Sequence, residues 1–170
     1  MLHGRDRAEG GVMGRRSALL GGAAVIGGLL AAPARAAGSF EVTRPDEEWR
    51  RLLTPEQYRV LRKHGTERAG SSPLDGETRR GTFHCAACAL PVYASDTKFD
   101  SRTGWPSFWA PLEGAVGTSE DRSWFGTRTE VHCRRCGGHL GHVFDDGPRP
   151  TGLRYCMNGV ARAFVPAAAV

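Results

Sequence analysis

Two pairs of cysteines, each with two residues between its members, constrain the fold of this 170-residue chain more than any other feature. The pairs are Cys85 with Cys88 and Cys133 with Cys136, and the 44 residues 89–132 separate them. Each short turn directs two sulfurs toward one point, so the two turns together suit one tetrahedral zinc ion held by four thiolates. Such an ion joins two distant hairpins and offsets the chain entropy of closing the loop between them.

Two redox-active cysteine pairs are the alternative interpretation of this spacing. Redox pairs of this kind usually open a helix, whereas Gly137 and Gly138 directly after the second pair favour a tight turn. Structural zinc is therefore the interpretation that we favour. A site with four thiolate ligands is closed and leaves no coordination position for a substrate. We expect one zinc ion that holds the fold and takes no part in the chemistry.

The first 36 residues have the order of an export signal. Arg15 and Arg16 precede the uncharged, mostly apolar residues 17–32, and Ala34-Arg35-Ala36 follows as a cleavage site. The apolar run is shorter than the roughly 20 residues that span a bilayer. The paired arginines predict a signal of the twin-arginine type. An uncleaved membrane anchor is the alternative, and translation from Met13 is an alternative start.

This division predicts a twin-arginine-type signal peptide in residues 1–36 and one domain in residues 37–170. We expect that domain to be a periplasmic monomer without stable membrane association after cleavage. Of the formal net charge of +5, residues 1–36 carry +3, from five arginines against Asp6 and Glu9. The basic balance therefore gives poor support for a nucleic-acid partner, and we expect none. Because the twin-arginine route moves folded proteins, zinc loaded before export would protect the thiolates from oxidation.

Two short helices are predicted at the start of this domain. Residues 46–53 place acidic side chains before basic ones, as a helix dipole prefers. Thr54-Pro55-Glu56-Gln57 then has the pattern of a capping box with proline at the first helical position. The second helix should run to about Lys63 or His64, with Gly65 as its stop.

A small antiparallel β domain is predicted for the rest of the chain. Residues 69–77 are rich in glycine, serine and proline and are typical of a loop. From Gly81 onward, short apolar runs alternate with glycine and proline. These runs predict strands at residues 82–84, 90–94, 123–128, 129–132, 142–144 and 161–165.

The fifth cysteine has no ligand role in this arrangement. Cys156 lies between Arg154 and Asn158, and side chains two residues apart in a strand point to the same face. A nearby guanidinium lowers the pKa of a thiol, and an amide offers hydrogen bonds to a polar ligand. Cys156 is therefore a candidate nucleophile. The alternative is a small buried hydrophobic residue, which is the commoner fate of a free cysteine.

Two further motifs carry weaker signals. His139 and His142 precede a Val-Phe pair and are candidates for acid–base chemistry, but ordinary core histidines or spare metal ligands are the alternatives. Trp105 lies between Gly104 and Pro106, which suggests a rigid loop that presents the ring. A rigid indole face is suitable for gripping a methyl group, although a core cluster is the plainer interpretation.

The chain resembles the methionine sulfoxide reductase B family. The matching blocks are residues 43–68, 82–109 and 123–164, which cover nearly all of the predicted domain. The resemblance implies a mainly β fold: a small antiparallel domain, β-tent-like or barrel-like, with N-terminal helices and a four-cysteine zinc site. It also implies thiol-dependent reduction of methionine-R-sulfoxide, in oxidised proteins or peptides and possibly as the free amino acid. The reductant would be a thioredoxin-like protein or a small thiol.

The resemblance assigns roles to individual residues. Cys156 matches the family nucleophile, which becomes a sulfenic acid during turnover, and Trp105 matches the wall that receives the S-methyl group. Arg154 matches the arginine beside the nucleophile. The polar cluster that orients and protonates the sulfoxide oxygen is matched by His139, His142 and Asn158.

Two positions depart from the family pattern. Many members have a resolving cysteine where this chain has Thr103, so no cysteine remains to form an internal disulfide with Cys156. Relatives commonly have a serine where this chain has Gly159, which is expected to loosen a strand slightly. A non-catalytic ligand-binding domain of the β-tent type and a zinc-ribbon nucleic-acid binder are the competing hypotheses. The first has no need for Cys156, His142 and Asn158, and both the near-neutral charge of residues 37–170 and the export signal argue against the second.

Overall fold

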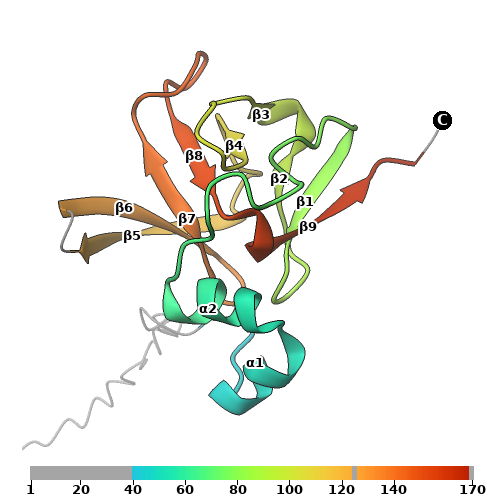
Figure 1. Cartoon of the computed structure of the whole chain (residues 1–170), viewed down its shortest axis with the longest axis vertical. Coiled ribbons are helices and arrows are strands. Elements are labelled where there is room, and N and C mark those ends of the chain that lie inside the picture. Colours follow the sequence, from blue (N-terminus) through green and yellow to red (C-terminus); the bar gives the residue numbers. More distant parts are fainter. Residues whose placement is uncertain (1–39, 124–125, 169–170) are drawn as a thin grey trace, which may run out of the picture. The chain divides into compact units, whose positions relative to one another are not determined.

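The computed structural model describes residues 40–123 and 126–168, which belong to one compact unit (Figure 1). The predicted signal peptide in residues 1–36 lies outside the described residues and stays a prediction. Within the two described ranges, no helix is long and apolar enough to cross a membrane.

Both predicted helices are present. Helix α1 is Asp46–Leu52 and helix α2 is Pro55–Lys63. The capping box of α2 is confirmed: the backbone N–H of Gln57 donates to Thr54 Oγ1 at 3.2 Å, and that of Thr54 donates to Gln57 Oε1 at 3.0 Å. Helix α2 ends at His64, which adopts the left-handed conformation one residue before the predicted glycine stop. The buried face of α2 consists of Tyr58, Val60 and Leu61.

Nine strands form two antiparallel sheets in the described part of the chain (Figure 1). The first sheet has the order β2-β1-β9, with β1 Gly81–Cys85, β2 Pro91–Ala94 and β9 Arg162–Pro166. The second sheet has the order β3-β4-β8-β7-β6-β5. Its strands are β3 Lys98–Phe99, β4 Ser107–Phe108, β5 Val116–Ser123, β6 Gly126–Cys133, β7 His139–Phe144 and β8 Arg154–Met157. Two 3-10 helices complete the fold, η1 Ser95–Thr97 and η2 Gly159–Ala161. The mainly β fold class with N-terminal helices is thus confirmed.

The prediction for residues 123–132 was wrong. The structure has no strand break at residues 128–129; β5 and β6 instead form one long hairpin, in which Ser123 pairs with Gly126 and Val116 pairs with Cys133. Strand β5 contains the polar run 118–122, whose first three residues are exposed. Without apolar residues at alternate positions, this strand lacks the pattern from which strands are recognised in a sequence.

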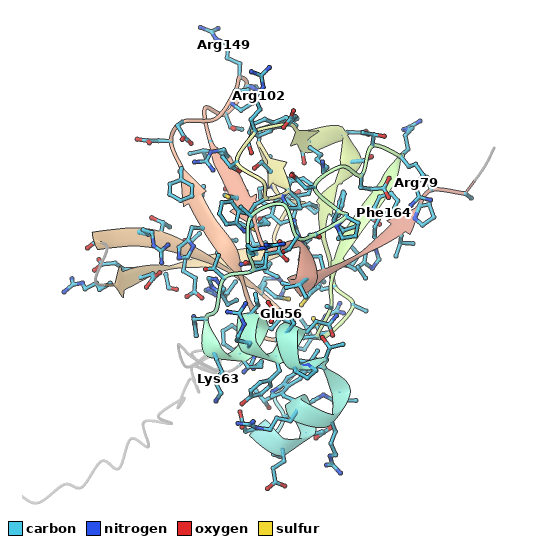
Figure 2. All side chains as sticks on the ribbon, in the orientation of Figure 1. Glu56, Lys63, Arg79, Arg102, Arg149 and Phe164 are labelled. Carbon is cyan, nitrogen blue, oxygen red and sulfur yellow. The ribbon has the colours of Figure 1, made fainter. Side chains whose placement is uncertain are left out.

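Aromatic rings from both sheets pack around a buried arginine. Phe83 of β1 meets Phe108 of β4 edge to face, with ring centroids 4.9 Å apart, and Tyr93 of β2 stacks on Phe108 at 4.4 Å. The Arg162 guanidinium lies 5.0 Å from the Phe108 centroid, and burial lowers the pKa of Arg162 to about 10. This residue therefore stays charged at neutral pH, and its Nη2 donates to the carbonyl of Met157 in β8 at 3.2 Å. By contrast, Figure 2 shows Arg149 projecting outward from its loop.

Candidate active site

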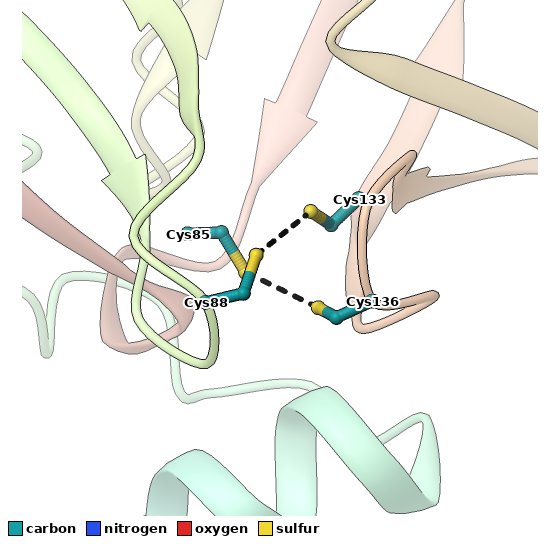
Figure 3. Close-up of side chains that lie close together, drawn as sticks. All are labelled: Cys85, Cys88, Cys133 and Cys136. Carbon is teal, nitrogen blue, oxygen red and sulfur yellow. Dashed lines mark hydrogen bonds between the residues drawn. The ribbon is translucent and has the colours of Figure 1, made fainter. Parts of the chain in front are cut away.

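Four cysteine side chains converge between the two sheets (Figure 3). Cys85 ends β1 and Cys133 ends β6, so each sheet contributes one pair. The Sγ atoms of Cys85 and Cys136 are 3.7 Å apart, and those of Cys88 and Cys133 are 3.5 Å apart. Sulfurs at the corners of a tetrahedron about 2.3 Å from zinc lie about 3.8 Å from one another. The donor set and its spacing fit a closed four-thiolate metal site.

Both cysteine pairs lie in the same kind of turn. The residue after the second cysteine has a positive φ in each turn, 57° at Ala89 and 67° at Gly137. The N–H of Ala89 donates to Cys85 O, and the N–H of Gly137 donates to Cys133 O. Neither pair opens a helix, so the tight-turn interpretation is confirmed and the redox-helix alternative is not.

Cys156 lines a separate pocket with a volume of about 130 Å³. Strand β8 places Cys156 opposite Ser107 of β4 and opposite His142 of β7. The lining residues are Thr66, Trp105, Arg128, Gly141, His142, Phe144, Cys156 and Asn158. The structure therefore brings together four residues that the sequence predicted for one site: Trp105, His142, Cys156 and Asn158.

Burial and polar neighbours act in opposite directions on the Cys156 thiol. Burial raises its pKa, while Arg154, Thr103 and the more distant Arg162 favour the thiolate. Burial prevails, and the net pKa of Cys156 lies above its ordinary value. Arg154 thus lowers the pKa of the Cys156 thiol as predicted, but this effect is smaller than that of burial. The Arg154 guanidinium donates to both oxygens of Asp146 at 2.8 and 2.9 Å, and this carboxylate offsets much of its charge.

Arg154 also lies beside the pocket and not among its lining residues. Its guanidinium covers the ring of Phe144 at 4.5 Å from the centroid, and Phe144 itself lines the pocket. Strand alternation brings the Arg154 guanidinium within hydrogen-bonding reach of the Cys156 thiol, and the same guanidinium binds Asp146 in the neighbouring loop.

His142 is held by an acid from the β5–β6 hairpin. Its Nε2 lies 2.7 Å from Asp121 Oδ2, which also accepts from Arg128 Nη2 at 2.8 Å. The pKa of Asp121 is lowered, first by its hydrogen bond with His142, so the carboxylate is ionised and accepts the Nε2 proton. Burial lowers the pKa of His142 although Asp121 opposes this effect. His142 is therefore a neutral ring at neutral pH, with Nδ1 as its proton-accepting nitrogen.

His139 lies one layer behind this pocket. It is buried, and its ring centroid is 5.2 Å from that of His142. Its Nδ1 donates to Glu130 Oε1 at 2.7 Å, and Glu130 also accepts from Ser119 and from His64. Burial disfavours the ionised Glu130, but these hydrogen bonds outweigh it and lower its pKa to about 2. His139 thus supports His142 from behind and does not line the pocket.

Trp105 and Asn158 have fixed orientations. Gly104 has a φ of 84°, and its carbonyl accepts from Gly70 N–H at 2.7 Å, so the predicted rigid loop is present. Asn158 follows β8 directly, and its Nδ2 donates to Leu140 O at 3.2 Å. One hydrogen on Nδ2 therefore remains for a ligand.

The structure shows the contacts of Thr103 and Gly159, the two residues that depart from the family pattern. Thr103 Oγ1 lies 4.0 Å from Cys156 Sγ, so this position faces Cys156. Gly159 lies in η2 and not in a strand, which corrects the expectation of a loosened strand. A Cβ at this position would lie 2.0 Å from Ser72 Oγ, so the glycine admits the loop that contains Ser72.

Several residues of the site carried no recognisable signal in the sequence. Asp121 and Arg128 become neighbours only because β5 pairs with β6 in the register that places them opposite each other. Glu130 meets His139 across β6 and β7, and Glu67 is a buried acid in a loop. Each of these contacts joins segments whose pairing is decided by the whole sheet.

Comparison with known proteins agrees with this geometry. The family model described as the SelR domain matches residues 53–166. A peptide methionine sulfoxide reductase MsrB of Agrobacterium fabrum is 53% identical over 129 residues, 75% of this chain and 96% of the relative. Proteins of the same name from Leptospira interrogans and Pseudomonas putida are 52% and 55% identical, over 74% and 71% of this chain and 97% and 91% of theirs. The chain belongs to the methionine sulfoxide reductase B family.

Proposed function

We propose that this protein reduces methionine-R-sulfoxide in peptides and proteins, with Cys156 as the nucleophile. The main support for this proposal is the position of Cys156. It is the one cysteine outside the four-sulfur cluster, and it shares a pocket with Trp105, His142 and Asn158. Family membership supports the same reaction. The protein then repairs oxidised methionine side chains.

The pocket residues suit the parts of a methyl sulfoxide. The Trp105 ring offers an apolar face for the S-methyl group, and the remaining Nδ2 hydrogen of Asn158 can donate to the sulfoxide oxygen. His142 lies opposite Cys156 on the neighbouring strand and has an accepting Nδ1. We assign it the proton transfer that converts the thiol to a thiolate as the substrate enters.

In the first step the Cys156 thiol is itself the reductant, so the reaction needs no added redox group. The Cys156 thiolate attacks the sulfoxide sulfur, and the thiol proton passes through His142 to the sulfoxide oxygen. Oxygen moves to Cys156 as the S–O bond to methionine breaks, leaving a sulfenic acid and a free thioether. Arg154 and Asp146 act beside the pocket, and His139 with Glu130 supports the orientation of His142.

An outside thiol must regenerate the enzyme. No other cysteine lines the Cys156 pocket, and the remaining four form the four-sulfur cluster. A small thiol or a thioredoxin-like protein would attack the sulfenic acid, release water and form a mixed disulfide, which a second thiol reduces.

The surroundings of the pocket favour a polypeptide substrate. An open cleft of about 710 Å³ follows strands β5 and β6, and it shares Arg128 and Phe144 with the Cys156 pocket. Residues on either side of a methionine sulfoxide have space there while the sulfoxide itself enters the pocket. Free methionine sulfoxide has no neighbouring residues that could bind in this cleft, so we expect it to be the weaker substrate.

The remaining proposals concern metal and location. The four cysteines would hold one zinc ion with a structural role, supported by the donor set and by the 3.5 and 3.7 Å sulfur distances. Residues 1–36 would export the domain of residues 37–170 to the periplasm by the twin-arginine route, where we propose that it acts as a monomer.

Turnover of dabsylated methionine-R-sulfoxide and methionine-S-sulfoxide with excess dithiothreitol tests the function. We expect turnover of the R epimer and at least about 10²-fold less of the S epimer, because exchanging methyl and oxygen separates the oxygen from Asn158. Equal rates on both epimers would contradict the assigned pocket. Binding of the R epimer without turnover would instead support a ligand-binding domain.

A further inference from the structure

Glu67 is a buried acid that lies in the loop after helix α2 and outside the core of apolar side chains. Only 3% of its surface is exposed. None of the ion pairs in the described part of the chain includes it. A buried carboxylate is costly unless hydrogen bonds satisfy it, so its bonding partners indicate what it does.

The Glu67 carboxylate binds the backbone directly after Asn158. Its Oε1 accepts from the N–H of Gly159 at 2.5 Å, and its Oε2 accepts from the N–H of Val160 at 2.8 Å. These two N–H groups belong to the start of η2, where peptide N–H groups have no partner within the helix. Two charge-assisted hydrogen bonds therefore fix the turn that carries Asn158.

The backbone of Glu67 binds two pocket side chains. Its N–H donates to Asn158 Oδ1 at 2.9 Å, and its carbonyl accepts from Trp105 Nε1 at 3.1 Å. The preceding residue, Thr66, itself lines the pocket. One residue thus connects the apolar wall and the amide of the same site.

We propose that Glu67 is a positioning residue of the reductase: its carboxylate locks the η2 turn and its peptide groups orient Asn158 and Trp105. This inference rests on the proposed function, because it assigns an effect on the reaction at Cys156. With Oδ1 tied to Glu67 and one Nδ2 hydrogen tied to Leu140, the amide plane of Asn158 has one orientation. A displacement of about 1 Å at such a group lowers a rate by about 10²-fold.

The close packing of loop and turn supports this role. A Cβ on Gly159 would lie 2.0 Å from Ser72 Oγ and 3.4 Å from Glu67 Oε1. The loop that contains Glu67 and Ser72 therefore occupies the space that a side chain at position 159 would need, so loop and turn are closely packed.

The test is Glu67→Gln, with Glu113→Gln as the matched control. The amide keeps the shape of the side chain but places an NH2 group against one of the two backbone N–H groups. Glu113 is exposed and lies away from the pocket lining, so its variant should match the wild type. We expect Glu67→Gln to lower kcat for the R epimer by about 10²-fold per folded site, with KM changed by less than about threefold. Zinc content counts the folded sites.

A double-mutant cycle separates positioning from general destabilisation. In an Asn158→Ala background, the effect of Glu67→Gln on kcat should shrink to about threefold or less, because the group that it positions is absent. A wild-type kcat in Glu67→Gln, or the same fold-loss in both backgrounds, would overturn the proposal. If the wild type itself turned over neither epimer, the proposed function would fail first, and that result is read before any variant.

Discussion

The surroundings of Cys156 favour its protonated thiol. Burial raises its pKa more than Arg154 and Thr103 lower it, and Arg154 is engaged with Asp146. A thiol that is protonated at rest is also slow to oxidise, because the thiolate is the reactive form. In the proposed mechanism, proton transfer to His142 would activate the thiol when the substrate binds.

Replacing the nucleophile should remove the activity and leave the fold. We expect Cys156→Ser to lower turnover of the R epimer by at least about 10³-fold, because a hydroxyl is a far weaker nucleophile than a thiolate. Zinc content should stay at one ion, since the four ligands are untouched. Turnover and metal analysis of the same preparation check both parts, and substantial residual activity would remove Cys156 from its role.

The raised pKa predicts the pH dependence of thiol reactivity. Iodoacetamide alkylates the thiolate, so the Cys156 rate should still be rising at a pH where a model cysteine peptide has levelled off. A raised pKa leaves a smaller fraction of Cys156 as thiolate at a given pH, so the rate reaches its plateau at a higher pH. Mass spectrometry of the Cys156 peptide measures the rate in zinc-loaded protein. A midpoint on the acid side of the model peptide would contradict the burial argument.

Thr103 decides how the sulfenic acid is resolved. After one equivalent of methionine-R-sulfoxide without reductant, Cys156 of the wild type should give a dimedone adduct, because no second cysteine lines its pocket. In Thr103→Cys the new sulfur replaces an oxygen 4.0 Å from Cys156 Sγ, so a small movement allows a disulfide. That variant should instead lose two hydrogens in mass and form no adduct. A disulfide between Cys156 and a cluster cysteine in the wild type would exclude the one-cysteine mechanism.

At the scale of elements, the two cysteine turns are the joint between the sheets. The turn after β1 and the turn after β6 have the same hydrogen bonds and the same left-handed position, yet they belong to different sheets. An ion bound to both therefore fixes how one sheet meets the other.

Loss of one cysteine of the cluster should weaken the connection between the two sheets. We expect Cys88→Ser and Cys133→Ser to lose zinc and to lower Tm by about 10 °C or more, which corresponds to a destabilisation of about 3 kcal/mol or more. Cys156→Ser is the matched control, since it removes a thiol of the same chain outside the cluster and should keep both zinc and Tm. Scanning calorimetry with metal analysis measures the two effects. A metal-free wild type of unchanged Tm would show that the cluster has another role.

At the scale of the whole molecule, the active site is built from segments that the fold alone brings together. Strands β7 and β8 supply His142 and Cys156, the β3–β4 connection supplies Trp105, and the loop after α2 supplies Glu67. The core beneath them is shared by both sheets through Phe83, Phe108 and Arg162. We therefore expect the stability of the cysteine cluster and the order of the pocket to be coupled.

Metal removal should reveal this coupling. Chelation of the zinc-loaded protein is expected to lower the hydrogen-exchange protection of β1 and of β6 together, because each of these strands ends at a cluster cysteine. Cys156 alkylation should then become faster as the pocket opens. Exchange measured by mass spectrometry before and after chelation checks the prediction, and loss of protection in one sheet alone would contradict it.

The sequence by itself determined the features that depend on local spacing and local chemistry. The two cysteine pairs, the capping box at Thr54 and the lone Cys156 are each legible within a few residues, because turns and caps form between near neighbours. The resemblance to a known family then placed Trp105, His142 and Asn158 in one site, and the structure has all three in the pocket. Only the tertiary structure decided the β5–β6 register that pairs Asp121 with Arg128, the ion pair of Arg154 with Asp146 and the hydrogen bond of Glu67 with Asn158. The physical reason is that these contacts join segments far apart in the chain, where sheet pairing and burial choose the partners and no local pattern records the choice.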